Sequence, residues 1–200
     1  VYGIAKMLNF AHGDVIMVGA YVCFFAMTGL SPMFEAGSMA AAVVPALAGV
    51  VLSMAVCTVL GVVIEGLAYK PLRQAPSLAV LITAIGVSYF LQNSALILWS
   101  SSPKIFSPIV GSGSQKIGPL TISHVTLVTI AACVVIMLAL TAFTGRTKMG
   151  KAMRAVSEDK GAAQLMGINV NRTISMTFAI GSALAAIAGV LLCSAYPTLT

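Results

Sequence analysis

The sequence predicts an all-α protein, a polytopic bundle of transmembrane helices. Only 8% of the residues are charged and 59% are hydrophobic, whereas a soluble globular domain carries about 25% charged residues. Five apolar runs contain no charge, at 15–34, 36–64, 74–103, 117–145 and 173–200. Each is long enough to cross about 30 Å of hydrocarbon as a helix. The runs do not alternate in polarity as the strands of a membrane barrel do.

The expected spans follow these runs in order: 15–30, 39–66, 77–99, 123–144 and a last span within 173–200. Between the third and fourth spans, segment 101–122 is rich in Ser, Gly and Pro, which favour turns over a further span. Val1 is not an initiator Met, and the chain stops directly after an apolar run. We therefore expect a single transmembrane domain over 1–200 that is incomplete at both ends.

The charges predict the orientation. Segment 146–172, here called the basic loop, holds six of the eleven Lys and Arg residues but only Glu158 and Asp159 as acidic residues. Basic residues gather in cytoplasmic loops, so this loop is predicted to be cytoplasmic in a multi-pass membrane protein. Lys70 and Arg73 then fall on the same side. The net charge of +6 is accounted for by this orientation, and nucleic acid is not expected as a partner.

Two short helices are predicted within the basic loop. Four apolar residues recur at helical spacing and give the first helix one apolar face: Met149, Ala152, Met153 and Val156. Ser157 can cap the second helix, with Glu158 and Asp159 in its first turn and Gly167 at its end. Such a loop can receive a cytoplasmic protein, or it can rest on anionic lipid headgroups; the residue pattern leaves both open.

Polar residues near or within the spans are candidates for a translocation path. They are Asn9, His12, Asp14, Gln92 and Asn93. The segment around Gly13 reads as a break between helical segments, and broken helices line transport paths in membrane transporters. The plainer alternative is that Asp14 caps a helix beside a His at the interface, and that Gln92 forms a helix–helix hydrogen bond.

The residue types do not point to an enzyme. The two His residues show no metal-ligand spacing, and no phosphate-binding Gly-rich loop or Ser/His/Asp grouping is visible. The four Cys residues lie one to a run without paired spacing, as small apolar side chains do. No catalytic residue, bound metal or cofactor is expected in this chain.

Several motifs resemble the permeases of branched-chain amino acid ABC importers. They are LNFAHGD at 8–14, MVGAY at 17–21, YKPLR at 69–73, LITAIG at 81–86, FLQN at 90–93, RAVSED at 154–159, LMGIN at 165–169 and TFAIG at 177–181. Ala162, Ala163 and Gly167 also resemble the EAA signature of ABC importer permeases, although Gly161 stands where that motif has Glu.

The resemblance implies a permease subunit that uses ATP bound and hydrolysed on two partner subunits. These partners would dock at Ser157, Glu158, Asp159, Ala162, Ala163 and Gly167. It also implies a second related permease, an external substrate-binding protein, and further spans beyond both ends. Urea or short-chain amide permeases are alternatives within the family, and an ion-coupled secondary transporter is an alternative outside it. The near absence of acidic residues within the spans argues against ion coupling.

Overall fold

The computed structural model describes residues 10–30, 39–73, 75–100, 102, 104–105, 113–117, 120–196 and 198–199. The described chain is predominantly helical, as predicted. Its long helices are α2 (His12–Leu30), α3 (Met39–Ile64), α4 (Ser77–Trp99), α5 (His124–Arg146) and α8 (Val170–Ala195). Within the described residues, all five are long and apolar enough to cross a membrane. The predicted count and order of spans are confirmed.

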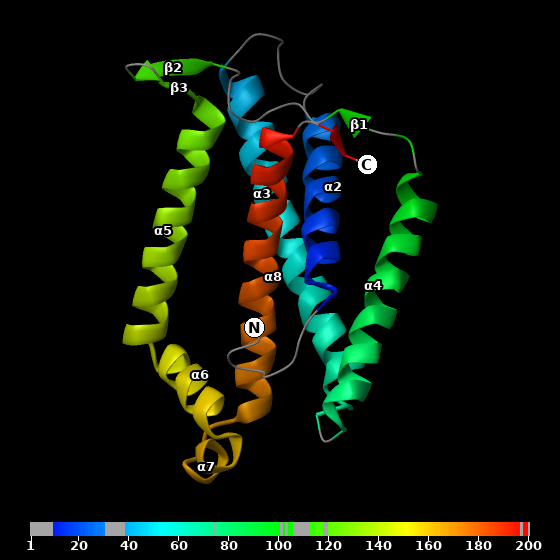
Figure 1. Ribbon diagram of the computed structural model, residues 1–200, viewed down its shortest axis with the longest axis vertical. Helices are drawn as coiled ribbons and strands as arrows, with labels where there is room; N and C mark the ends of the chain where they lie inside the picture. The colour runs from blue at the N-terminus through cyan, green and yellow to red at the C-terminus, as the bar shows by residue number, and fades with distance from the viewer. Residues whose placement is uncertain are drawn as a thin grey trace.

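Three helical elements lie outside these spans or extend them. The second span continues from α3 into a π-helical turn, η2 (Glu65–Tyr69), and the basic loop contains α6 (Lys148–Glu158) and α7 (Lys160–Leu165). The turn after η2 lies at the same end of the bundle as α6 and α7 (Figure 1). Lys70 and Arg73 therefore lie on the side of the basic loop, as the charge pattern predicted.

Short strands occupy the opposite end. The strands β2 (Ser114–Ile117) and β3 (Leu120–Ser123) pair antiparallel, and β1 (Lys104–Ile105) pairs with β4 (Thr198–Leu199). Strands β1 and β2 and most of β3 lie in segment 101–122, where the sequence predicted only turns, whereas β4 lies at the end of the last apolar run. They are two-stranded pieces at the ends of spans (Figure 1), and they leave the all-α class unchanged.

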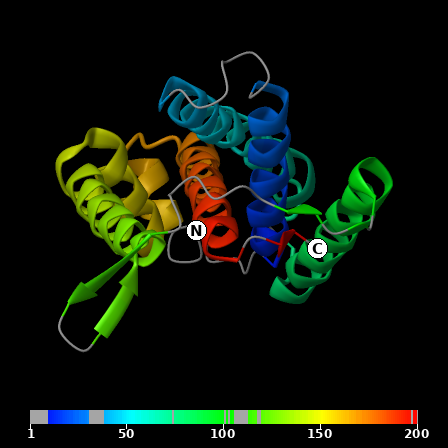
Figure 2. The same cartoon turned by 90° about the horizontal axis from the view of Figure 1, so that it is seen from above.

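Helices α2, α3 and α8 form the core of the bundle, whereas α4 and α5 stand on opposite flanks (Figure 2). Small residues let the core helices approach closely: a Cβ added at Gly19 would lie 2.8 Å from Ala186 Cα, and one at Gly189 would meet the Ile16 carbonyl. Ser53 Oγ donates to the Gly19 carbonyl oxygen at 2.7 Å across α3 and α2. In lipid, close packing and interhelical hydrogen bonds of this kind replace the hydrophobic drive between helices.

Candidate coupling and transport sites

The first helix of the basic loop, α6, has the predicted apolar face. Met153 and Val156 are buried, and Met149 and Ala152 are half-buried. Thr147 caps the helix, because its Oγ1 accepts a hydrogen bond from the Gly150 amide at 2.9 Å. The buried face turns toward the bundle, and α6 packs against α5 and α8. Helix α6 therefore fixes the basic loop to the ends of α5 and α8.

The second helix, α7, begins two residues later than predicted. Ser157 and Glu158 belong to the end of α6, and Ser157 Oγ donates to the Arg154 carbonyl instead of capping α7. The cap is Asp159, whose carboxylate accepts from the amides of Gly161 and Ala162 at 2.7 and 3.1 Å. A carboxylate at this position also favours the positive end of the helix dipole, which explains why Asp159 takes the place predicted for Ser157.

Gly167 ends the helical region as predicted. Its φ of +81° lies in the left-handed region that glycine tolerates best. The Gly167 amide donates to the Gln164 carbonyl and the Ile168 amide to the Ala163 carbonyl, each at 3.0 Å. This pair of bonds is a Schellman motif. It joins α7 to the start of α8 through a fixed turn.

The tip of the loop exposes two bulky apolar side chains. Leu165 is 90% exposed and Met166 is 82% exposed, while Ala162 and Gly167 are also exposed. Ala163, in contrast, is 4% exposed and packs against the core of the chain. Helix α7, which ends at Leu165 and is followed by Met166, lies at the far end of the basic loop, away from the spans (Figure 1). Exposed apolar groups gathered at one spot are typical of a protein-binding surface.

Sequence reasoning did not single out Leu165 and Met166. Their exposure depends on which face of the short helix α7 meets the bundle. With Ala163 buried, the helix turns Leu165 and Met166 away from the chain. A usable signal was present: two large apolar residues next to the terminating Gly167, outside every span.

A buried carboxylate joins α2 to α4. Asp14 is 7% exposed and accepts hydrogen bonds from Ser88 Oγ at 2.5 Å and from Gln92 Nε2 at 3.0 Å. Gln92 Nε2 also lies 3.3 Å from Ser88 Oγ. Ser88 is the middle residue of α4, so this polar cluster lies deep within the span. The helix–helix hydrogen bond predicted for Gln92 is present, and its partner is Asp14.

The other candidates for a translocation path are less closely associated. His12 is the first residue of α2 and is half-buried; Asp14 follows in the first turn and is not the N-cap. Helix α2 begins part-way along the bundle, while α3 and α4 continue toward the α6–α7 end (Figure 1). Asn93 is exposed and its amide donates to the Tyr89 carbonyl of its own helix at 2.7 Å. Asn9 lies outside the described residues.

A second buried carboxylate lies at the inner end of α3. Glu65 is 1% exposed and forms a salt bridge with Arg73. The Ser175 hydroxyl of α8 donates to the other carboxylate oxygen at 2.6 Å. Arg73 also donates to the Asn171 side chain. The pairing gives this buried charge the partners it needs.

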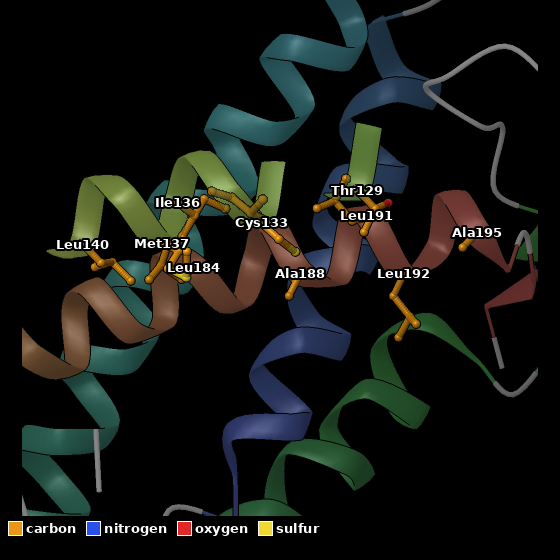
Figure 3. A pocket seen from close by; sticks show the side chains of 11 residues that line it. Thr129, Cys133, Ile136, Met137, Leu140, Leu184, Ala188, Leu191, Leu192 and Ala195 are labelled. Atoms are coloured by element: carbon orange, nitrogen blue, oxygen red, sulfur yellow. The ribbon is translucent and has the colours of Figure 1, made fainter. Parts of the chain in front are cut away.

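An apolar groove of about 540 Å³ separates α5 from α8. Figure 3 shows side chains of α5, such as Cys133 and Met137, facing those of α8, such as Leu184. The lining is aliphatic apart from Thr129 and Cys133, so the groove offers nothing to recognise a charged amino or carboxylate group. Among the described residues, no three His, Cys, Asp or Glu side chains gather as a metal site would require.

Comparison with known proteins shows the family of the chain. Residues 1–199 match the family model described as the permease component of branched-chain amino acid transport systems. The chain is 39% identical to the high-affinity branched-chain amino acid transport system permease protein BraD of Pseudomonas aeruginosa over 196 residues. It is 41% identical to the corresponding LivH protein of Escherichia coli K12 over 198 residues. Each alignment covers 96% of this chain and 62% of the relative.

A probable branched-chain amino acid transport permease protein, LivH of Methanocaldococcus jannaschii, is 28% identical over 198 residues, which cover 92% of this chain and 56% of that protein. No solved structure matches the chain. Together with the five candidate spans, the family places it as a multi-pass protein of the bacterial inner membrane. The chain belongs to the family of permease components of branched-chain amino acid transport systems.

Proposed function

We propose that this chain is the larger part of the transmembrane permease subunit of a bacterial ABC importer that carries branched-chain amino acids inward. ATP would be bound and hydrolysed on two partner subunits, with no cofactor, metal or catalytic residue in this chain. A second related permease would complete the path, and an external binding protein would deliver the substrate. The chain spans about 62% of its curated relatives, and their printed names support this substrate over urea or short amides.

The observation that carries the proposal is the exposed tip of the basic loop. Leu165 and Met166 stand almost fully exposed at the end of the molecule that the charge pattern assigns to the cytoplasm. Apolar anchors that enter a pocket on a partner are the usual centre of a protein interface. The docking surface we propose consists of Glu158, Asp159, Ala162, Leu165, Met166 and Gly167, with Ser157 half-buried at its edge and Ala163 supporting it from behind.

The fixed turn at Gly167 gives the loop a mechanical role. Because two backbone hydrogen bonds join α7 to the start of α8, a partner that grips α7 also holds the inner end of a core helix. Closure of the ATP-binding subunits would then bias the bundle between outward-open and inward-open arrangements, as a population shift requires.

The Asp14 cluster is the candidate for the translocation path. A carboxylate with two neutral donors, Ser88 and Gln92, lies at the level of the middle of α4. Intramembrane carboxylates face cavities or partner helices, and this one could attract the ammonium group of an amino acid. His12 would lie at the approach to this cluster, and Asn93 would lie beside it on α4.

An ion-coupled transporter is less well supported. Such a protein would use intramembrane carboxylates, and the structure does contain two that are buried, Asp14 and Glu65. Glu65, however, is neutralised by Arg73 at the inner end of α3. The curated relatives are named as permease proteins of transport systems, which favours the importer over an ion-coupled transporter.

The docking assignment is tested with Leu165→Asp in the full-length permease, expressed with its ATP-binding subunits. We expect the ATP-binding subunits to stop copurifying and leucine uptake to fall by at least about 30-fold, because interface anchors contribute about 2 kcal/mol or more. Membrane insertion should be unchanged, since the side chain contacts little of its own chain. Copurification and uptake at wild-type levels would refute the assignment.

Ser102→Asp is the matched control. It introduces the same charge at an exposed site at the opposite end of α4 from the basic loop. The control should leave both copurification and uptake unchanged. Ala163 is less suited to this test, because it is buried and a bulky residue there would disrupt the loop itself.

A further inference from the structure

Four polar side chains form one connected group at the inner end of the bundle, here called the inner clamp: Glu65, Arg73, Asn171 and Ser175. The Glu65 carboxylate binds Arg73 through one oxygen and the Ser175 hydroxyl through the other. The Arg73 guanidinium also donates to the Asn171 side-chain oxygen. The group therefore connects the end of α3, the segment before α4, and the first two turns of α8.

The inner clamp continues a seam along one face of α8. Asn171, Ser175, Phe178 and Ser182 recur at spacings of four, three and four residues, so they share one face of the helix. Phe178 lies against Tyr69, with ring centroids 5.4 Å apart. A Cβ added at Gly61 would collide with the Ser182 hydroxyl. The end of α3 with its π-helical turn is therefore held against the first half of α8 at Gly61, Glu65 and Tyr69.

The clamp lies directly behind the exposed tip. Asn171 is the second residue of α8, and the Schellman turn at Gly167 binds that end of α8 to α7. A displacement of α7 would therefore reach Asn171 of α8 before it reaches α3 or α4. From Asn171, the hydrogen bond to Arg73 leads both to Glu65 and to the entry of α4.

Arg73 is suited to this position by its shape. The guanidinium presents donors in a planar fork and can bind two partners at once, here Glu65 through Nη2 and Asn171 through Nη1. A Lys presents a single ammonium and cannot reproduce the fork. Glu65 sits in a π-helical turn, where the Lys70 amide donates to its carbonyl at 2.8 Å. Such turns interrupt regular helices and are frequent at functional positions.

We propose that Arg73 and Glu65 are positioning residues that make the inner ends of α3 and α4 follow the movement of the basic loop. This proposal rests on the proposed function, because it needs partner subunits that move α7. Without the inner clamp, α7 and the start of α8 would still move on ATP hydrolysis. The inner ends of α3 and α4 would no longer be carried with them, and hydrolysis would proceed without transport.

The test compares Arg73→Ala, Arg73→Lys and Asn171→Ala in the full importer, reconstituted in vesicles with labelled leucine outside. The measured quantity is leucine taken up per ATP hydrolysed. We expect Arg73→Ala to lower this ratio by about fivefold or more, the lower range of coupling between linked sites. Arg73→Lys should lower it in the same direction, because Lys cannot hold Glu65 and Asn171 together. Asn171→Ala should lower it less, since the Glu65 pair remains.

Lys70→Ala is the matched control, an exposed basic residue in the same turn, and it should keep the wild-type ratio. A wild-type ratio in both Arg73→Ala and Asn171→Ala would overturn the proposal. So would a loss of inserted protein whose remaining fraction transports at the normal ratio, because that result describes a structural role only. If Arg73→Ala does not insert, Asn171→Ala decides alone, since Asn171 is exposed and loses one hydrogen bond.

Failure of the proposed function gives a different pattern. If docking is absent, the ATP-binding subunits do not copurify with the wild-type permease, whatever the state of the clamp. If the clamp alone is wrong, copurification and the leucine-to-ATP ratio both stay normal in the Arg73 variants.

Discussion

The two helices that carry the basic loop differ in how the bundle holds them. Helix α8, which follows the basic loop in the chain, has buried residues in every turn from Thr173 to Ser194. Helix α5, which precedes the loop, has no buried residue, and a groove of about 540 Å³ lies between α5 and α8. The basic loop is therefore attached to one helix that packs firmly in the bundle, α8, and to one that packs loosely, α5.

This difference indicates the direction in which force would travel. If a partner moves α7 as proposed, α5 would offer little resistance, because few side chains would have to repack there. On the α8 side, the Tyr69–Phe178 contact and the inner clamp would connect the same movement to α3. The sequence alone treats both helices as equal apolar spans. The asymmetry is a property of packing.

The largest effect is expected from a substitution that weakens the packing of α8. Phe178→Ala should lower the free energy of unfolding by about 3 kcal/mol, because it leaves a cavity against Tyr69 in the core. The paired change on the loose foot, Met137→Ala, should alter it by less than about 0.5 kcal/mol, since Met137 is exposed and borders the groove. Denaturant unfolding of the full-length protein in lipid discs measures both. Equal losses in the free energy of unfolding would mean that α5 and α8 are held equally firmly.

A second prediction concerns the other flanking helix, α4. Asp14→Ala removes the acceptor of Ser88 and Gln92 and should cost about 1 kcal/mol, since interhelical hydrogen bonds in membranes contribute about 0.6 kcal/mol each. Hydrogen exchange of the α4 amides should rise near Ser88. Tyr21 still stacks on Trp99 with ring centroids 4.7 Å apart, so the outer end of α4 should stay protected.

Asn93→Ala is the control for that change. Its amide bonds only within α4, to the Tyr89 carbonyl, so exchange in α4 should keep the wild-type pattern. If Asp14→Ala leaves α4 as protected as Asn93→Ala does, then the Asp14 cluster is not what holds α4.

The spans and the amphipathic face of α6 could be predicted because both depend on local composition. Uncharged runs and the spacing of Met153 and Val156 are readable along the chain. The partner of Asp14 could not be read in the same way, because Ser88 and Gln92 belong to a helix more than 70 residues away. Ser88 and Gln92 are four residues apart and so share a helix face, and the sequence predicted a helix–helix hydrogen bond for Gln92 only as an alternative, without its acceptor.

The N-cap of α7 is a feature that the local sequence alone could not predict. Ser157 and Asp159 are both good capping residues, and the choice between them depends on where α6 ends. The buried face of α6 extends through Val156, which carries that helix past Ser157. The exposure of Leu165 follows from the same packing. Tertiary contacts thus decided between two locally acceptable starts for α7.

The smallest expected effect tests the tip of the loop. Asp159→Ala removes the acceptor of the Gly161 and Ala162 amides, and loss of an N-cap costs about 1 kcal/mol. Helix α7 is only six residues long and has little other stabilisation of its own. We therefore expect amide exchange to rise in α7 while the α6 and α8 amides remain protected, as measured by mass spectrometry.

Gln164→Ala provides the comparison, because it changes an exposed residue of the same helix without touching the cap. Its exchange should match the wild type. The firm packing of α8 predicts one more detail. Because the Ile168 amide bonds to the Ala163 carbonyl and Ala163 is buried, fraying in Asp159→Ala should start at Gly161 and stop before Gly167. If the loosening instead spread into α8, the turn at Gly167 would be a flexible joint, and the loop could not transmit a push through α8.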